Sequence, residues 1–192
     1  MYNRRAGCGK FARPDLCGGG QVIGRSTTML SYPKGTSVRI DKVSENDSPL
    51  ILNFIRLKAE FDAKTSGSAS VVTTTVEKIK QTLFGEKPFA YALLLKDEQK
   101  AIGFALYHIR YSSFSGSPSI WLDDLFINDS ERSRGGGLQM INALTKEANE
   151  IGASHISWTA SIANTRGQKF YNRIGAEVDR KDGKLFYYSL SI

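Results

Sequence analysis

The sequence predicts an α/β fold in which about seven strands form one mixed sheet with four helices. From about Thr36, segments that alternate polar and apolar residues, such as 37–43, are interspersed with segments of helical periodicity. A strand, helix, strand unit at 119–159 calls for a right-handed parallel crossover, which makes the sheet mixed. The 192 residues, 41% hydrophobic and 23% charged, are typical of one globular domain.

The first strand, 37–43, is followed by two predicted helices. Asn46, Asp47 or Ser48 can cap the first helix. Its apolar face comprises Ile51, Phe54, Ile55 and Leu57. After the small and polar residues 64–71, a cap at Thr73 to Thr75 predicts a short second helix. The apolar residues of that helix are Val76, Ile79 and Leu83.

Three strands in a meander come next. The strand-like runs are 89–95, 101–111 and 119–127, and the polar segments 96–100 and 112–117 between them are typical of turns. Short connections of this kind predict neighbouring antiparallel strands.

The rest of the chain continues the alternation. A glycine-rich turn precedes a helix over 138–148 that ends near Gly152, and a strand follows at 155–159. The next helix carries Phe170 and Ile174 and closes at Gly175. Two last strands surround 176–178 and 185–190. The predicted order is strand, helix, helix, three strands, helix, strand, helix, strand, strand.

The net charge of +7 is concentrated at the N-terminus. Residues 1–36 hold six basic residues and one acidic residue, which leaves a charge of only +2 on the rest of the chain. We therefore expect no nucleic-acid partner. The longest apolar runs, such as 90–95, are too short for a membrane span, so no membrane partner is expected either. We predict that 1–35 is a disordered basic extension and that 36–192 is the folded domain.

The only cysteines, Cys8 and Cys17, lie in this extension. Their spacing matches neither a zinc site nor a secreted disulfide framework, so no metal site is predicted.

The glycine-rich turn, Arg132-Ser133-Arg134-Gly135-Gly136-Gly137, follows a strand and precedes a helix. Backbone N–H groups at a helix N-terminus bind phosphate, and glycine permits their close approach. An arginine can add a charge-assisted contact. Tight turns and flexible loops use the same residues, so the motif is either a phosphate-binding site or an ordinary turn.

This R-x-x-G-x-G turn resembles the cofactor motif of the Gcn5-related N-acetyltransferase (GNAT) superfamily. Downstream, Asn164 and Tyr171 lie in a stretch similar to that superfamily's N-x-x-x-x-x-F-Y-x-x-x-G-[AF] helix. Within the superfamily, residues 38–190 resemble the diamine (spermidine/spermine) N-acetyltransferases. The similar stretches include 84–89, 103–107 and 121–127. The resemblance implies a GNAT fold and a transferase that uses acetyl-CoA as co-substrate.

The resemblance also implies a cofactor site. The backbone of the strand end would hold the pantetheine chain and the thioester, the turn would hold the pyrophosphate, and the next helix would add contacts. These residues are Leu125, Phe126, Ile127, Arg132, Ser133, Arg134, Gly135, Gly136, Gly137, Leu138, Asn164, Thr165, Arg166, Gly167 and Tyr171. Tyr171 matches the family's general acid, although an aromatic pair with Phe170 in the core is the other interpretation.

An alkyl amine needs carboxylates that bind its cation and help to remove its proton. Asp123 and Asp124 lie near the end of a strand, and alternation predicts that they point to opposite faces. The resemblance assigns Asp123 to catalysis and implies a substrate site of Phe61, Asp62, Asp123, Ser157, Trp158, Thr159 and Asp182. The family typically has glutamate at Asp123 and Asp62 and tyrosine at Phe61, so the acceptor stays open. Asp182-Gly183 is also typical of a hairpin turn.

We therefore expect acetyl transfer to a primary amine of a small cationic substrate, a polyamine or a lysine-like amino acid, by direct attack in a ternary complex. The alternatives are a protein or antibiotic N-acetyltransferase and a non-catalytic acyl-CoA-binding regulatory module. The resemblance also implies a homodimer, and we expect a cytoplasmic protein.

Overall fold

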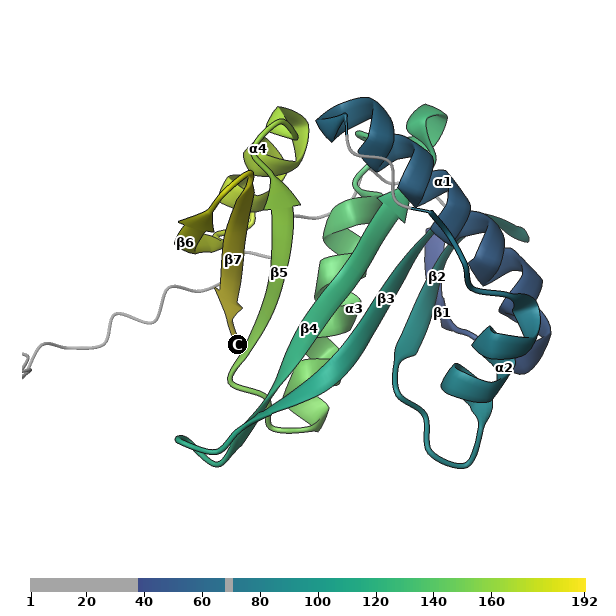
Figure 1. The fold of residues 1–192 in the computed structure, drawn as a ribbon, viewed down its shortest axis with the longest axis horizontal. Helices are drawn as coiled ribbons and strands as arrows, with labels where there is room; N and C mark the ends of the chain where they lie inside the picture. The colour runs from purple at the N-terminus through teal and green to yellow at the C-terminus, as the bar shows by residue number, and fades with distance from the viewer. Residues whose placement is uncertain (1–37, 68–70) are drawn as a thin grey trace, which may run out of the picture. The chain divides into compact units, whose positions relative to one another are not determined.

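The computed structural model describes residues 38–67 and 71–192, which form a seven-stranded sheet flanked by helices (Figure 1). The strands are β1 (Val38–Lys42), β2 (Tyr91–Asp97), β3 (Lys100–Ser112), β4 (Ser117–Ile127), β5 (His155–Ser161), β6 (Glu177–Asp182) and β7 (Leu185–Ser191). The helices are α1 (Ser48–Ser66), α2 (Val76–Phe84), α3 (Gly136–Glu150) and α4 (Thr165–Arg173). This order confirms the predicted α/β fold. The predicted extension and both cysteines lie outside the described residues.

The sheet has the strand order β1-β2-β3-β4-β5-β7-β6. Neighbouring strands are antiparallel except β4 and β5, which are parallel and are joined through α3. The predicted parallel unit at 119–159 is thus confirmed, and so is the meander of β2, β3 and β4.

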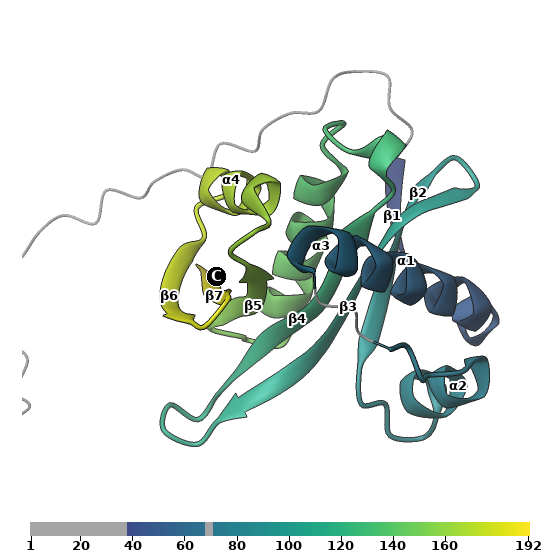
Figure 2. The same ribbon diagram turned by 45° about the horizontal axis from the view of Figure 1, so that its top comes forward.

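Helices cover the two faces of the sheet separately (Figures 1 and 2). On one face, Phe54 of α1 stacks on Phe104 of β3 with ring centroids 5.4 Å apart. On the other face, Leu144 of α3 is fully buried, and the hydroxyl of Tyr107 on β3 donates a hydrogen bond to Glu147. The apolar residues of α4 pack into the same cluster as α3. No helix in the described ranges is long and apolar enough to cross a membrane.

Local sequence signals set the helix ends. The Thr75 hydroxyl accepts a hydrogen bond from the Lys78 amide and caps α2, as predicted. Asn164 caps α4 through its side-chain oxygen, which accepts from the Gly167 amide at 2.9 Å. Helix α1 ends at Gly67, whose φ of +69° is a left-handed conformation that glycine adopts easily.

A β-bulge in β4 overturns one prediction. Tyr107 of β3 lies opposite Leu122, but the preceding residue, Leu106, lies opposite Asp124, so Asp123 is an extra residue in β4. A bulge of this kind resets the alternation of side chains along the strand. Leu106 packs into the clusters beneath α1, and Asp124, its partner, faces α1 as well. Asp123 shares this face, so the prediction that the two carboxylates point to opposite faces is wrong.

Strands β4 and β5 separate towards their C-terminal ends (Figure 1). Their pairing joins Ile120 to Ile156 and Trp121 to Ser157. Within the described part of the chain, no strand pairs with this edge of β4 beyond Trp121. The end of β4, 125–127, therefore presents backbone groups at the opening between the two strands.

Candidate active site

The glycine-rich turn forms a concave row of backbone amides at the start of α3. Ser133 and Gly135 have φ values of +66° and +83°, and Gly135 is the N-cap of the helix. Among residues 38–67 and 71–192, no acceptor hydrogen-bonds to the amides of 133–137. Successive free N–H groups in such a turn create an anion-binding site, which the helix dipole strengthens. The turn can therefore hold a phosphate group.

The two glycines that begin α3 leave little room for side chains. A Cβ on Gly136 would lie 2.5 Å from the Leu95 Cδ2 atom of β2. A Cβ on Gly137 would lie 3.1 Å from the ring of Phe170 in α4. The glycines thus allow the start of α3 to lie directly against the sheet and against α4.

The Arg132 side chain is held by the protein itself. Its Nε donates to the Ile127 carbonyl oxygen at 2.7 Å, and its guanidinium forms an ion pair with Asp129. The guanidinium also lies over the rings of Phe61 and Phe126, at 4.6 and 5.3 Å from the centroids. Arg132 therefore ties the turn to the end of β4, and Phe61 lies beneath it as a packing residue.

The second motif lies beside the turn. Arg166 of α4 donates a hydrogen bond of 3.0 Å to the hydroxyl of Ser133. Thr165, the first residue of α4, is exposed next to it, and Leu138 in the first turn of α3 is partly buried. Arg134 is ion-paired with Glu131. The two segments that carry the predicted cofactor residues thus meet at the opening between β4 and β5.

Tyr171 of α4 lies in an aromatic cluster next to this opening. Its ring centroid is 4.9 Å from that of Tyr188, 5.1 Å from that of Trp158 and 5.5 Å from that of Phe170. Burial raises the pKa of Tyr171 to about 12, and Tyr188 and the charge of Asp62 add to the increase. The phenol therefore keeps its proton at neutral pH.

A lysine that the motif analysis did not identify lies in the acidic cluster. The Lys58 ammonium of α1 is 2.5 Å from Asp62 and 3.4 Å from Asp124. Burial raises the pKa of Asp124, and Lys58 opposes that increase, whereas the charges of Asp123 and Asp62 add to it. The i, i+4 spacing of Lys58 and Asp62 was the sequence signal for this pair. The predicted carboxylate Asp62 and its neighbour Asp124 are thus partly neutralised by the Lys58 ammonium.

The remaining carboxylate, Asp123, is the more exposed one, with 52% of its side chain accessible against 23% for Asp124. The indole Nε1 of Trp121 donates to its Oδ1 at 3.0 Å, and the Nδ1 of His108 lies 3.9 Å from its Oδ2. Asp123 is therefore the cluster's most accessible acid.

The predicted residues on β5 and β6 are distributed differently. Ser157 lines a cavity on the same face as Asp123, and Thr159 pairs with Tyr187, which lines the same cavity. The Trp158 side chain is buried on the other face, against Tyr171. Asp182 is exposed at the hairpin between β6 and β7. The structure therefore brings Ser157 and Thr159 to this face, but not the Trp158 side chain.

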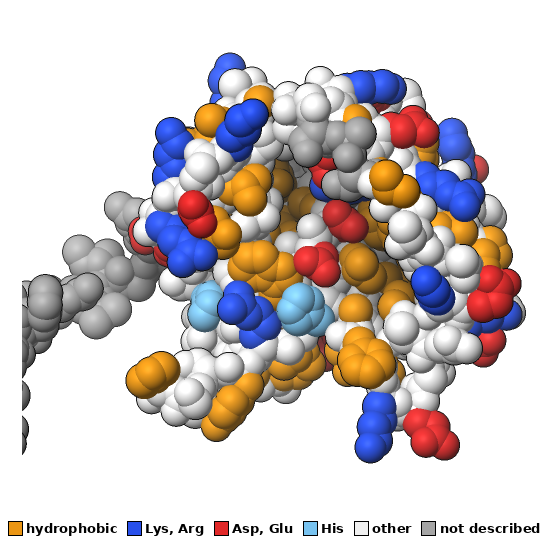
Figure 3. Space-filling view, in the orientation of Figure 1, with side chains coloured by type: hydrophobic (Ala, Val, Ile, Leu, Met, Phe, Trp, Pro, Cys, Tyr) orange, Lys and Arg blue, Asp and Glu red, His pale blue; other side chains and the backbone are white. Residues whose placement is uncertain are grey.

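The surface is hollowed beside α1, and acidic and hydrophobic side chains gather in this hollow (Figure 3). Across the described ranges, no group of three or more His, Cys, Asp or Glu side chains is arranged to hold a metal ion.

Comparisons with known proteins agree with this geometry. The chain matches the acetyltransferase (GNAT) family over residues 59–176, more than half of its length. It is 27% identical over 148 residues to the thialysine N-epsilon-acetyltransferase of Bos taurus, a match that covers 73% of this chain and 84% of the relative.

Two solved structures share the fold. An aminoglycoside acetyltransferase from an uncultured soil metagenomic sample, in complex with trehalose, has a TM-score of 0.64 at 18% identity, covering 76% of this chain and 92% of the other. An N-acetyltransferase of Thermoplasma acidophilum in complex with coenzyme A has a TM-score of 0.61 at 17% identity, covering 81% and 99%. The chain therefore belongs to the acetyltransferase (GNAT) family and is an acetyl-CoA-dependent N-acetyltransferase.

Proposed function

We propose that the protein acetylates a primary amine of a small cationic substrate, a polyamine or a lysine-like amino acid, by direct transfer in a ternary complex. The observation that carries this proposal is the presence of a partly exposed carboxylate, Asp123, together with a protonated phenol, Tyr171, whose pKa the charge of Asp62 helps to raise. Asp123 lies on the sheet face beside α1, whereas Tyr171 belongs to the aromatic cluster of α4 on the other face.

The unbonded amides of 133–137 fit the pyrophosphate of acetyl-CoA, and the unpaired edge of β4 at 125–127 fits its pantetheine chain and thioester carbonyl. The side-chain Nδ2 of Asn164 donates no hydrogen bond to any described residue, which leaves this nitrogen available at the same site. Arg132 holds the turn in place through its own contacts. Acetyl-CoA contributes the activated acetyl group.

Asp123 would bind the substrate ammonium and take its proton, directly or through water. The amine nitrogen then forms a bond to the acetyl carbon and gives its second proton to water while the carbon–sulfur bond breaks. Tyr171 would give its proton to the departing thiolate, and the resulting phenolate would regain a proton from water. A phenol with a pKa of about 12 transfers a proton only to a strong base close to it, so the position of the sulfur against Tyr171 is essential.

Two alternative functions would use the same cofactor turn. A protein or antibiotic acetyltransferase would use the same cofactor site with another acceptor, as in the aminoglycoside acetyltransferase from the soil metagenome. A non-catalytic acyl-CoA-binding module would keep only the turn. The presence of both Tyr171 and the partly exposed Asp123 favours catalysis over such a module.

Release of free thiol from acetyl-CoA tests the proposal. The acceptors are spermidine, spermine, putrescine, L-lysine, thialysine, a lysine-bearing peptide and an aminoglycoside. We expect turnover with at least one of the small amines. Turnover only with the peptide or the aminoglycoside would select the first alternative, and calorimetric binding of acetyl-CoA without turnover would select the second.

We also propose a homodimer, as the family resemblance implies, and a cytoplasmic location. Light scattering of the purified chain would reveal a monomer, which would contradict the first part, and fluorescence imaging of the tagged chain would check the second.

A further inference from the structure

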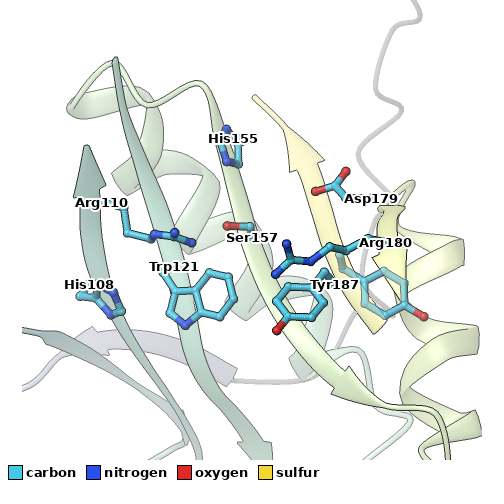
Figure 4. Close-up of a pocket in the computed structure, with 9 residues that line it drawn as sticks. His108, Arg110, Trp121, His155, Ser157, Asp179, Arg180 and Tyr187 are labelled. Atoms are coloured by element: carbon cyan, nitrogen blue, oxygen red, sulfur yellow. The ribbon is translucent and has the colours of Figure 1, made fainter. Parts of the chain in front are cut away.

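A cavity of about 500 Å³ opens on the sheet face that carries Trp121 and Asp123, and Figure 4 shows the side chains that line it. Both residues that contact the Asp123 carboxylate, Trp121 and His108, line it. An amine held at Asp123 would therefore extend the rest of its molecule into this cavity.

Two arginines, Arg110 and Arg180, line the cavity. The guanidinium of Arg110 lies 4.9 Å from the ring centroid of Trp121, and that of Arg180 lies 4.0 Å from the ring centroid of Tyr187. Among the described residues, no carboxylate lies within 4.0 Å of either guanidinium. An arginine stacked on an aromatic ring keeps its N–H edge free for bidentate binding of a carboxylate. Both groups are thus positioned and available.

A second β-bulge adds an acidic group next to Arg180. Val178 of β6 pairs with Tyr188 and Arg180 pairs with Tyr187, so Asp179 is the extra residue. The bulge brings Asp179 and Arg180 to the same cavity, where Figure 4 shows both side chains beside it. A carboxylate and a guanidinium side by side match the ammonium and carboxylate that an amino acid carries on one carbon.

The charges favour an amino acid over a polyamine. A polyamine has a second ammonium that would enter a cavity with two guanidiniums, two histidines and a single carboxylate. Two acids nearer α1, Asp62 and Asp124, already share the Lys58 ammonium. Like charges repel, whereas a carboxylate in the cavity would meet two unpaired guanidiniums.

We infer that this cavity binds the amino-acid head group of a substrate whose side-chain amine is acetylated at Asp123. Arg110 and Arg180 bind the carboxylate, and Asp179 binds the α-ammonium. This inference rests on the proposed function and narrows its substrate class to amino acids that end in a primary amine.

Matched pairs of substrates test the inference, because L-lysine and cadaverine, like L-ornithine and putrescine, differ only by the carboxylate. Thiol release is measured for each pair with the wild type, Arg110→Ala, Arg180→Ala and the control Arg56→Ala, which changes an exposed arginine on α1. Wild type should prefer the amino acid by about tenfold or more in kcat/KM. Each cavity variant should reduce that preference at least fivefold, and the control should retain it.

Equal kcat/KM values within each pair, or an equal loss on both members in the arginine variants, would overturn the inference and leave the proposed function standing. Calorimetry of L-lysine and cadaverine with coenzyme A-loaded protein tests the opposite case, in which the inference holds but the proposed function is wrong. Preferential binding of lysine that Arg180→Ala removes, without turnover of any amine, would support the cavity and refute the proposed function. No preference in binding would overturn the inference as well.

Discussion

The indole nitrogen of Trp121 donates a 3.0 Å hydrogen bond to Asp123, two residues further along β4. The bond joins Trp121, which is paired with both neighbouring strands, to the carboxylate of the bulge residue. The other carboxylate oxygen lies 3.9 Å from the Nδ1 of His108, so the hydrogen bond from Trp121 is the contact that orients Asp123 among the described residues. A carboxylate held in this way loses less side-chain freedom when it binds an ammonium.

Replacement of Asp123 by Asn should raise the KM of the amine by about tenfold or more, because a hydrogen bond to a charged group contributes about 1.5–3 kcal/mol. The KM of acetyl-CoA should change little. Trp121→Phe keeps the ring but removes the donor, so its increase in amine KM should be smaller than that of Asp123→Asn. Steady-state thiol release measures all three, and an unchanged amine KM in Asp123→Asn would remove this residue from the substrate site.

Replacement of Tyr171 by Phe should lower kcat by about 10²- to 10⁴-fold, the usual contribution of a general acid. The ring contacts with Trp158 and Tyr188 are retained, so the Kd of coenzyme A should be nearly unchanged. Calorimetry gives the Kd and single-turnover kinetics give the rate. Equal losses in affinity and rate would instead indicate that the tyrosine packs the site without acting as an acid.

The sequence predicted the order of the elements well because each element carries its own local signal. Period-two alternation marked the strands, and two predicted helix boundaries agree with the structure: Thr75 caps α2, and Gly175 follows the end of α4. The parallel pairing of β4 and β5 followed from the single helix between them.

The substrate site was predicted less well because it depends on two bulges. Nothing in the sequence around Asp123 or Asp179 marks an extra residue, yet each bulge decides which face the neighbouring side chains share. Arg110 and Arg180 are 70 positions apart, and only the strand order shows that they line the same cavity. The cofactor turn is continuous in sequence, which explains why it was recognised.

The partly buried carboxyl of Asp124 should make stability depend on pH. Burial raises its pKa in the folded protein above the ordinary value of 3.8. Between the unfolded and the folded pKa, the folded state binds more protons, so the free energy of unfolding falls as the pH rises. Each unit of pKa difference corresponds to about 1.4 kcal/mol.

Asp124→Asn should therefore gain stability relative to the wild type as the pH rises from about 4, in urea unfolding followed by circular dichroism. Lys58→Met removes the attraction that opposes the increase in pKa, so the loss of stability with pH should become larger in that variant. If the free energies of unfolding of the wild type and Asp124→Asn change in parallel across this pH range, the raised pKa assigned to Asp124 is contradicted.

Alanine variants of two glycines at opposite ends of α3 distinguish a loss of cofactor binding from a general effect of backbone strain. Gly135 at the start has a φ of +83°, and Gly152 just beyond the end has a φ of +65°. Alanine at either position pays a similar cost of about 1–2 kcal/mol for the left-handed conformation. Both variants should therefore lose stability to a similar extent in thermal unfolding.

Only Gly135→Ala should weaken coenzyme A binding, because the strain there moves the unbonded amides of 133–137. The loss of one charge-assisted hydrogen bond would raise the Kd about tenfold or more. Gly152→Ala has open space around its new methyl group and lies at the far end of the helix, so its Kd should equal that of the wild type. Equal Kd values for the two variants in calorimetry would show that the turn does not hold the pyrophosphate.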